Sequence, residues 1–263
     1  MVKKIQLFQV DAFTNKVFHG NPAAVCILEE ELDEKIMQAI AAENNLAETA
    51  FVFKKNDAFD IRWFTPSVEV DLCGHATLAS AHVLFNNFHY QSEKITFHSH
   101  KSGVLIVKKD EDYYTLDFPS DVYKEINAPQ TLLNALGVSP LETYFGKTDY
   151  LLIFSSQEEI ENMNPDLGLL ATIEARGIIV SAPGNHENFV SRFFAPQSGI
   201  DEDSVTGSAH TTLIPYWSKK LGLIKMSAKQ LSKRQGTLLC EYLGDRVKIS
   251  GKAITYLIGE IEI

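Results

Sequence analysis

The sequence contains an internal duplication whose period is about half the chain. Arg62-Trp63-Phe64-Thr65-Pro66 is followed, twelve residues after its arginine, by Gly74-His75-Ala76. Arg192-Phe193-Phe194-Ala195-Pro196 is followed, fifteen residues after its arginine, by Gly207-Ser208-Ala209. Both copies have the order aromatic strand, proline, acidic loop, glycine and small-residue helix start. This repetition predicts two structurally similar halves.

Each copy ends in a helix that is apolar on most of its faces. The first helix begins at Gly74, which should permit a tight turn, and the second is predicted over 207–221. Helices that are apolar nearly all round belong inside a core. Their first turns hold only small or polar residues, so unpaired backbone N–H groups and the positive end of the helix dipole would form an anion site.

Short strands make up most of the remaining chain. In the first half, strands are predicted over 5–13, 23–28, 48–53, 59–64, 94–97, 103–108 and 113–118. In the second half they are predicted over 150–154, 177–180, 189–194, 238–241, 246–249 and 253–263. Further helices are expected over 34–43, 131–136 and 165–174, and residues 119–129 resemble a linker between the halves.

Composition excludes several classes of protein. The chain has 263 residues, 45% of them hydrophobic, which is enough for two ordinary cores. Its net charge of −10 argues against nucleic acid or an anionic membrane as a partner, because both need basic patches. Three widely separated cysteines do not form a disulfide framework. With no apolar run typical of a signal peptide or a membrane span, we expect a cytoplasmic protein.

Three side chains are candidates for chemistry, although each also has an ordinary structural explanation. Glu48 begins a mostly apolar strand, where a carboxylate is costly unless it is paired or used, or reaches water at the strand end. His75 is the second residue of the first buried helix, where the dipole should keep its ring neutral and able to exchange a proton, or where it could act as a cap. Asp203 lies ahead of the second helix, where acids also interact favourably with the dipole.

A pseudo-two-fold arrangement of the halves would bring the two helix starts together. Glu48, His75 and Asp203 would then line a pocket. Its floor would be the backbone N–H groups of the first two residues of each helix, namely Gly74, His75, Gly207 and Ser208. Such a pocket could bind a carboxylate and move a proton on the neighbouring carbon.

Other motifs are absent or incomplete. Gly146-Lys147-Thr148 ends like a P-loop, but Leu141 occupies the position of the leading glycine, and no G-x-G-x-x-G occurs. His98 and His100 share a strand face with no further Cys or His nearby, so we expect no metal. Neither H-E-x-x-H nor G-x-S-x-G occurs. No cofactor is therefore expected.

Four blocks of the sequence resemble the PhzF family, the phenazine-biosynthesis isomerases and their relatives, which share the diaminopimelate epimerase fold. The blocks are residues 8–13 with 20–25, 45–52, 71–79 and 202–209. The resemblance implies an α+β fold of two pseudo-symmetric halves, each a mixed β-barrel around a central helix. We expect the first half to be 1–118, completed by the strand 253–263, and the second to be 119–252. The active site would lie between the halves, and the protein would be a homodimer.

The same resemblance implies roles for individual residues. Glu48 matches the family's proton-shuttling acid/base, and His75 and Asp203 match residues that line the substrate site. Gly74 and Ser208 match positions that meet the substrate's carboxylate. In the phenazine pathway this machinery isomerises trans-2,3-dihydro-3-hydroxyanthranilate without a cofactor. The expected activity is therefore a cofactor-independent isomerisation of a small carboxylate-bearing molecule.

Two departures from the family pattern bear on the substrate. Ala47 replaces the serine that usually precedes the catalytic glutamate, and Ser204 replaces the usual proline. The epimerase branch of the fold uses two cysteines; here Cys73 stands at one position and Thr206 at the other, so Cys73 is expected to be a small packing residue. The alternatives are an amino-acid racemase or epimerase on the same fold, and a binding protein without turnover.

Overall fold

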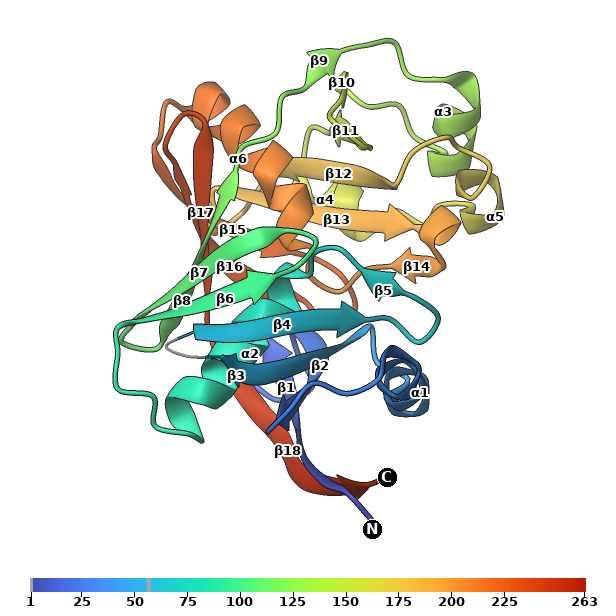
Figure 1. Ribbon diagram of the computed structural model, residues 1–263. Helices are drawn as coiled ribbons and strands as arrows, with labels where there is room; N and C mark the ends of the chain where they lie inside the picture. Colours follow the sequence, from blue (N-terminus) through green and yellow to red (C-terminus); the bar gives the residue numbers. More distant parts are fainter. Residues whose placement is uncertain (1, 56–57) are drawn as a thin grey trace. The chain divides into compact units, whose positions relative to one another are not determined.

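The computed structural model describes residues 2–55 and 58–263, which form two compact units (Figure 1). Unit 1 comprises residues 1–117 and 250–263, and unit 2 comprises residues 118–249. Each unit is a mixed sheet with few helices, in agreement with the α+β class predicted from the sequence.

Unit 1 is a curved sheet around one buried helix. Its elements are β1 (Lys4–Ala12), β2 (Asn21–Leu28), α1 (Glu34–Asn44), β3 (Glu48–Lys55), β4 (Ala58–Phe64), β5 (Glu69–Val70), α2 (Gly74–Asn86), β6 (Lys94–Ser99), β7 (Gly103–Asp110), β8 (Tyr113–Pro119) and β18 (Ala253–Glu262). The strands are paired in the order β18, β1, β2, β3, β4, β6, β7, β8, with β2–β3 and β4–β6 parallel and the other pairs antiparallel. Every residue of α2 from His75 to Phe85 is buried, as its apolar sequence predicts.

Helix α1 covers the outer side of this sheet, away from α2 (Figure 1). Asp33 begins the helix by accepting a hydrogen bond from the backbone N–H of Lys35, and Asn45 ends it in the left-handed conformation. Its buried residues Met37, Ile40 and Ala41 pack in a cluster that includes side chains of β2, β3 and β4. One amphipathic face therefore holds α1 on the sheet.

Unit 2 has the same design. Its elements are β9 (Lys124–Glu125), α3 (Gln130–Leu136), β10 (Glu142–Phe145), β11 (Asp149–Ile153), α4 (Gln157–Glu161), α5 (Leu167–Leu170), β12 (Gly177–Pro183), β13 (Phe189–Ala195), β14 (Ile200–Glu202), α6 (Gly207–Leu221), β15 (Lys225–Gln230), β16 (Gly236–Tyr242) and β17 (Arg246–Gly251), with a 3₁₀ turn at Pro196–Ser198. Parallel pairs β11–β12 and β13–β15 correspond to β2–β3 and β4–β6 of unit 1. Helix α6 occupies the place of α2, between the short strand β14 and β15.

The duplication extends to individual side chains. In unit 1, Arg62 on β4 donates to Glu69 on β5 and lies 5.2 Å from the ring of Phe64. In unit 2, Arg192 on β13 donates to Glu202 on β14 and lies 4.8 Å from the ring of Phe194. Each ion pair holds a short antiparallel strand in place immediately before the buried helix.

The expected helix over 165–174 is wrong in extent, because only α5, one turn long, forms there. After that turn the backbone tightens, with the N–H groups of Thr172 and Ile173 donating to carbonyls three residues earlier. The expected linker over 119–129 contains the short strand β9, which pairs with β10.

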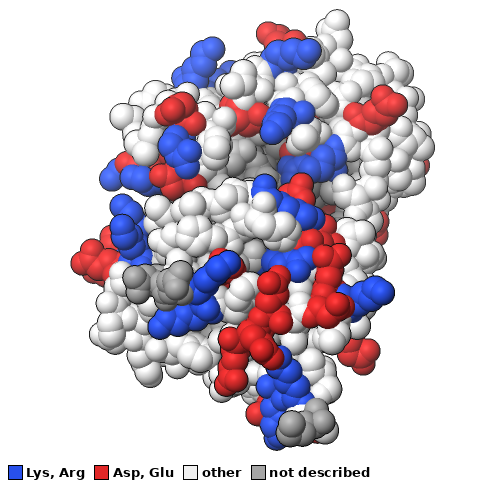
Figure 2. Space-filling view, viewed as in Figure 1, with Lys and Arg blue, Asp and Glu red and all other residues white. Residues whose placement is uncertain are grey.

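The surface carries charges of both signs. On the face of the described residues seen in Figure 2, basic side chains are scattered among acidic ones rather than gathered in one patch. None of the helices in residues 2–55 and 58–263 is long and apolar enough to cross a membrane.

Candidate functional site

Glu48 lies at the first position of β3, where the strand enters the core of unit 1. It is aligned with Ala23 in the parallel pair β2–β3, and Thr49, Ala50, Phe51 and Val52 after it are buried on both faces of the sheet. Its side chain is only 14% exposed. Because the strand is buried on both faces, the carboxylate is held at the edge of the core and cannot turn freely into water.

The structure brings His75 against Glu48. His75 is the second residue of α2, and its Nε2 lies 3.2 Å from Oε2 of Glu48. That oxygen is buried and has no hydrogen-bond partner among the described residues, so the contact with His75 is an ion pair without hydrogen-bond alignment. On the other side of the ring, Nδ1 lies 3.2 Å from Nδ2 of Asn21 and 3.5 Å from Sγ of Cys73.

The neighbours of His75 act against the neutral ring that is expected from the helix dipole. Burial would lower the pKa of His75, but the neighbouring Cys73 and the Glu48 carboxylate raise it well above its ordinary value. Burial raises the pKa of Cys73, and the Glu48 carboxylate raises it further. The Glu48 carboxylate therefore favours a proton on each of its two neighbours, His75 and Cys73.

Cys73 is more than the small packing residue expected from the sequence. It is buried, takes an extended conformation and immediately precedes α2. Gly74 is the first residue of the helix and is not among the residues with positive φ, so the chain turns without the tight glycine turn that was expected there. The ligand atoms of Glu48, Cys73 and His75 all lie within 4.8 Å of one another.

Gly20 positions Asn21 at the beginning of β2. It has a φ of +65°, and a Cβ placed on it would lie 2.1 Å from the carbonyl oxygen of Ala12. Only glycine allows this close approach, which sets the register of β1 and β2 and so the place of the Asn21 amide beside His75.

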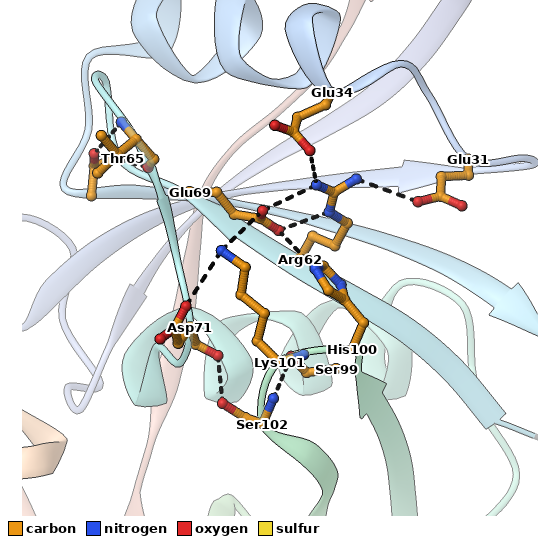
Figure 3. Close-up of polar contacts among 11 residues, drawn as sticks. Glu31, Glu34, Arg62, Thr65, Glu69, Asp71, Ser99, His100, Lys101 and Ser102 are labelled. Atoms are coloured by element: carbon orange, nitrogen blue, oxygen red, sulfur yellow. Dashed lines mark hydrogen bonds and ion pairs between the residues drawn. The ribbon is translucent and has the colours of Figure 1, made fainter.

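A network of charged side chains holds the segment that leads into α2 (Figure 3). Arg62 on β4 donates to Glu69 on β5 at 2.8 Å, and its other nitrogens reach two further glutamates. Lys101, between β6 and β7, lies 3.2 Å from Glu69 and 3.3 Å from Asp71. Burial would raise the pKa of Glu69, but Arg62 and Lys101 lower it below its ordinary value. Because Asp71 precedes Cys73 by two residues, the network fixes the entry to the site.

Asp203 lies in a hydrogen-bonded cluster inside unit 2. Its Oδ2 accepts a hydrogen bond from Oγ1 of Thr206 at 2.6 Å. The side chain of Gln230 bridges the same loop, accepting from the N–H of Thr206 and donating to the carbonyl of Asp203, each at 2.8 Å. Asp203 is therefore held rigidly just before α6.

Gly207 and Ser208 are the first two residues of α6, as Gly74 and His75 are of α2. Gly207 is buried, whereas Ser208 is exposed and its Oγ accepts a hydrogen bond from Arg176 at 2.9 Å. Arg176 is held in turn by Asp149.

Several residues around these clusters could not be found from the sequence. Asn21 was visible only as part of a Gly-Asn-Pro turn within a block that resembles the family, with no role assigned, and Gln230 and Arg176 belong to no motif. Their partners are 54, 24 to 27 and 32 residues away along the chain, so only the folded structure shows the contacts.

Two α+β units with the same strand connections, each built around a buried helix, define the diaminopimelate epimerase-like class of fold that the sequence resembles. A crystal structure of a hydroxyproline epimerase from Agrobacterium vitis shares this fold, with a TM-score of 0.66 at 9% identity, over 99% of this chain and 93% of that one.

The chain belongs to the family of phenazine biosynthesis-like proteins, whose PhzC-PhzF model matches residues 10–259. An uncharacterized isomerase of Pseudomonas aeruginosa is 47% identical over 99% of both chains. The crystal structure of a PhzF-family phenazine biosynthesis protein from Enterococcus faecalis has a TM-score of 0.96 and 45% identity, over 98% of this chain and 99% of that one. The predicted membership of the PhzF family is confirmed.

Proposed function

We propose that this protein is an isomerase that moves a proton on a small carboxylate-bearing substrate, with Glu48 as the acid/base. The observation that carries the proposal is the buried Oε2 of Glu48, which has no hydrogen-bond partner among the described residues and lies 3.2 Å from Nε2 of His75. A carboxylate held at the edge of the core, beside a histidine ring, is placed to act as a general acid/base. Relatives that are named isomerases support the assignment.

In the proposed reaction, an oxygen of Glu48 takes a proton from a carbon next to a π-system. The electron pair of the broken C–H bond spreads over that π-system, and the same carboxyl group returns the proton to another carbon. Substrate and product are isomers, so no oxidant or reductant is needed. His75, whose pKa is raised by its neighbours, would stabilise the negative charge that develops on the substrate.

The first turn of α2 would hold the substrate's carboxylate. Backbone N–H groups of Gly74 and His75 open this helix and have no partner within it. Preorganised donors of this kind lower a barrier by about 3 kcal/mol each. The roles predicted for Asp203, Gly207 and Ser208 in binding the substrate, and the homodimer, stay predictions.

The first prediction is that Glu48→Gln loses proton transfer. Dihydro-hydroxyanthranilate and a panel of small amino and hydroxy acids are incubated in D₂O, and deuterium incorporation is followed by NMR. We expect exchange with the wild type and a rate at least about 100-fold lower in Glu48→Gln, because the amide cannot accept the proton. Glu241→Gln is the matched control, since Glu241 is half-buried in unit 2 and paired with Lys248.

The position of the label separates the alternatives. Deuterium at a new carbon indicates isomerisation, whereas exchange with loss of stereochemistry at one carbon indicates a racemase. Ligand binding without any exchange supports a binding protein. Wild-type exchange rates in Glu48→Gln would contradict the proposed mechanism.

A further inference from the structure

Three different metal-binding side chains converge at the start of α2. Glu48 provides a carboxylate, Cys73 a sulfur and His75 a ring nitrogen, and within residues 2–55 and 58–263 these form a group of possible ligand atoms within 4.8 Å. All three are buried or nearly so. The sequence did not predict this group, because Glu48 lies on β3 and the other two lie at the start of α2, 25 or more residues later.

The distances are close to those of a tetrahedral metal site. Zinc binds sulfur at about 2.3 Å and nitrogen or oxygen at about 2.0–2.2 Å, so neighbouring ligand atoms stand about 3.3–3.6 Å apart. Oε2 of Glu48 is 3.2 Å from Nε2 of His75. Sγ of Cys73 is 4.0 Å from the same nitrogen. All three atoms lie within 4.8 Å of one another, so the Cys73 side chain would have to move closer for all three to bind one ion.

A further observation points to a ligand here. Oε2 of Glu48 is buried without a hydrogen-bond partner among the described residues, and Nε2 of His75 lies 3.2 Å from it. A cation bound by both atoms would take the place of the proton between them.

We propose that Oε2 of Glu48, Sγ of Cys73 and Nε2 of His75 bind one thiophilic divalent cation of the zinc class, with release of the thiol proton of Cys73 and the Nε2 proton of His75 to solvent. A sulfur ligand selects such ions over magnesium and calcium, which prefer oxygen ligands alone. Three protein ligands leave a fourth position for water or another small ligand.

The proposed metal site depends only on the geometry of these three side chains. Its effect on turnover, in contrast, rests on the proposed function. A cation on Oε2 would occupy the lone pair that accepts the substrate's proton. Bound zinc would therefore inhibit the isomerase, and a chelator would restore it.

The test is a titration of the full-length chain with Co²⁺, followed by competition with Zn²⁺. Cobalt bound to a thiolate gives a sulfur-to-metal charge-transfer band in the near ultraviolet, so the spectrum reports on Cys73 directly. We expect one equivalent of Co²⁺ to produce the band and Zn²⁺ to abolish it. Cys73→Ser should lose the band, and His75→Gln should weaken cobalt binding at least tenfold.

A second variant covers the case in which Cys73→Ser fails to fold. The other two cysteines, Cys26 and Cys240, are also buried, and in Cys26→Ser/Cys240→Ser only the thiol of Cys73 remains. This variant should keep the band. Absence of the band from the wild type, its loss from the double variant or its persistence in folded Cys73→Ser would overturn the proposal. Because the band needs no turnover, failure of the metal site is read separately from failure of the exchange assay.

Discussion

Gly20 shows how a single residue without a side chain places the candidate site. Its positive φ and its contact with the backbone at Ala12 leave no room for a Cβ. Gly244 is a useful comparison, because its φ is also positive, at +85°, but a Cβ there would have nothing within 4 Å.

We predict that Gly20→Ala destabilises the protein more than Gly244→Ala. The second change meets only the cost of a left-handed alanine, about 1 kcal/mol, whereas the first also forces the strands apart. Urea unfolding measures both, and we expect a further loss of about 1–3 kcal/mol at Gly20. Equal losses of stability in the two variants would show that the backbone at Ala12 can move aside at little cost.

His210 on α6 is a buried histidine outside the candidate catalytic group. Burial lowers the pKa of His210 to about 4, and its Nδ1 donates to the carbonyl of Thr206 at 2.8 Å. The unfolded chain, whose histidine has an ordinary pKa of about 6.5, binds a proton more readily than the folded one. The contribution of His210 to the free energy of unfolding is therefore fully present above about pH 6.5. It decreases as the pH falls toward 4 and does not change further below that pH.

We predict that His210→Gln flattens the acid side of the stability profile. Between pH 7 and pH 4, protonation of His210 should lower the free energy of unfolding of the wild type by about 3 kcal/mol. The variant should not show this loss. The free energy of unfolding is measured by denaturant at several pH values. His186→Gln, at an exposed position, is the control and should keep the wild-type slope. An unchanged slope in His210→Gln would contradict the assignment.

At the scale of the elements, each of the two arginine–glutamate pairs holds a short strand in place before a buried helix, but the surroundings of the two pairs differ. Glu69 in unit 1 keeps Lys101 as a second partner when Arg62 is removed. Arg192 in unit 2 also donates to the carbonyls of Ile160 and Met163, at 3.0 and 2.6 Å. Removing Arg192 would therefore leave two carbonyls without this donor as well as a carboxylate.

We predict that Arg192→Met costs more stability than Arg62→Met. Arg192→Met should lower the free energy of unfolding by about 3–5 kcal/mol and Arg62→Met by about 2 kcal/mol. Removing one partner of a buried ion pair is destabilising because the remaining polar groups lose their partner, and more such groups remain at Arg192. Double variants that also change Glu69 or Glu202 to Gln make the cause visible. The added change should recover most of the loss at Arg62 and only part of it at Arg192; equal recovery in both units would contradict this account.

The elements show which predictions sequence patterns allow. Helices α2 and α6 were predictable because a long run of apolar residues has few other solutions, and α6 indeed covers Gly207–Leu221. The stretch 165–174 has similar residues but forms only one turn, since the chain must leave it to enter β12. In the candidate site, Glu48 and His75 were identifiable as unusual side chains in apolar elements. The contact of Asn21 with His75 was not predictable, because no local pattern encodes an approach between β2 and the start of α2.

At the scale of the whole molecule, unit 1 is made from two separate stretches of chain. Strand β18 is antiparallel to β1 over the whole of Lys4–Ala12, which places β1 between β18 and β2. It also contacts α2, since His82 bonds to Thr255 at 2.9 Å. Unit 2, in contrast, is continuous over residues 118–249.

We predict that deletion of residues 253–263 loosens unit 1 and spares unit 2. Without β18, one edge of β1 loses its hydrogen bonds and α2 loses part of its cover. Hydrogen exchange with mass spectrometry should show faster exchange in β1, β2 and α2, with protection of α6 unchanged. Equal loss of protection in α6 would show that the two units unfold as one.

The discontinuous make-up of unit 1 also bears on how the protein folds as it is synthesised. Unit 2 is an uninterrupted segment and needs no later part of the chain to complete its core. The earlier-translated residues of unit 1 must wait for β18, and during this time β1 has an unpaired edge that can join other chains. The half that is translated first therefore cannot complete its sheet until the last strand has emerged, and chains that stop before residue 253 expose the edge of β1 to aggregation.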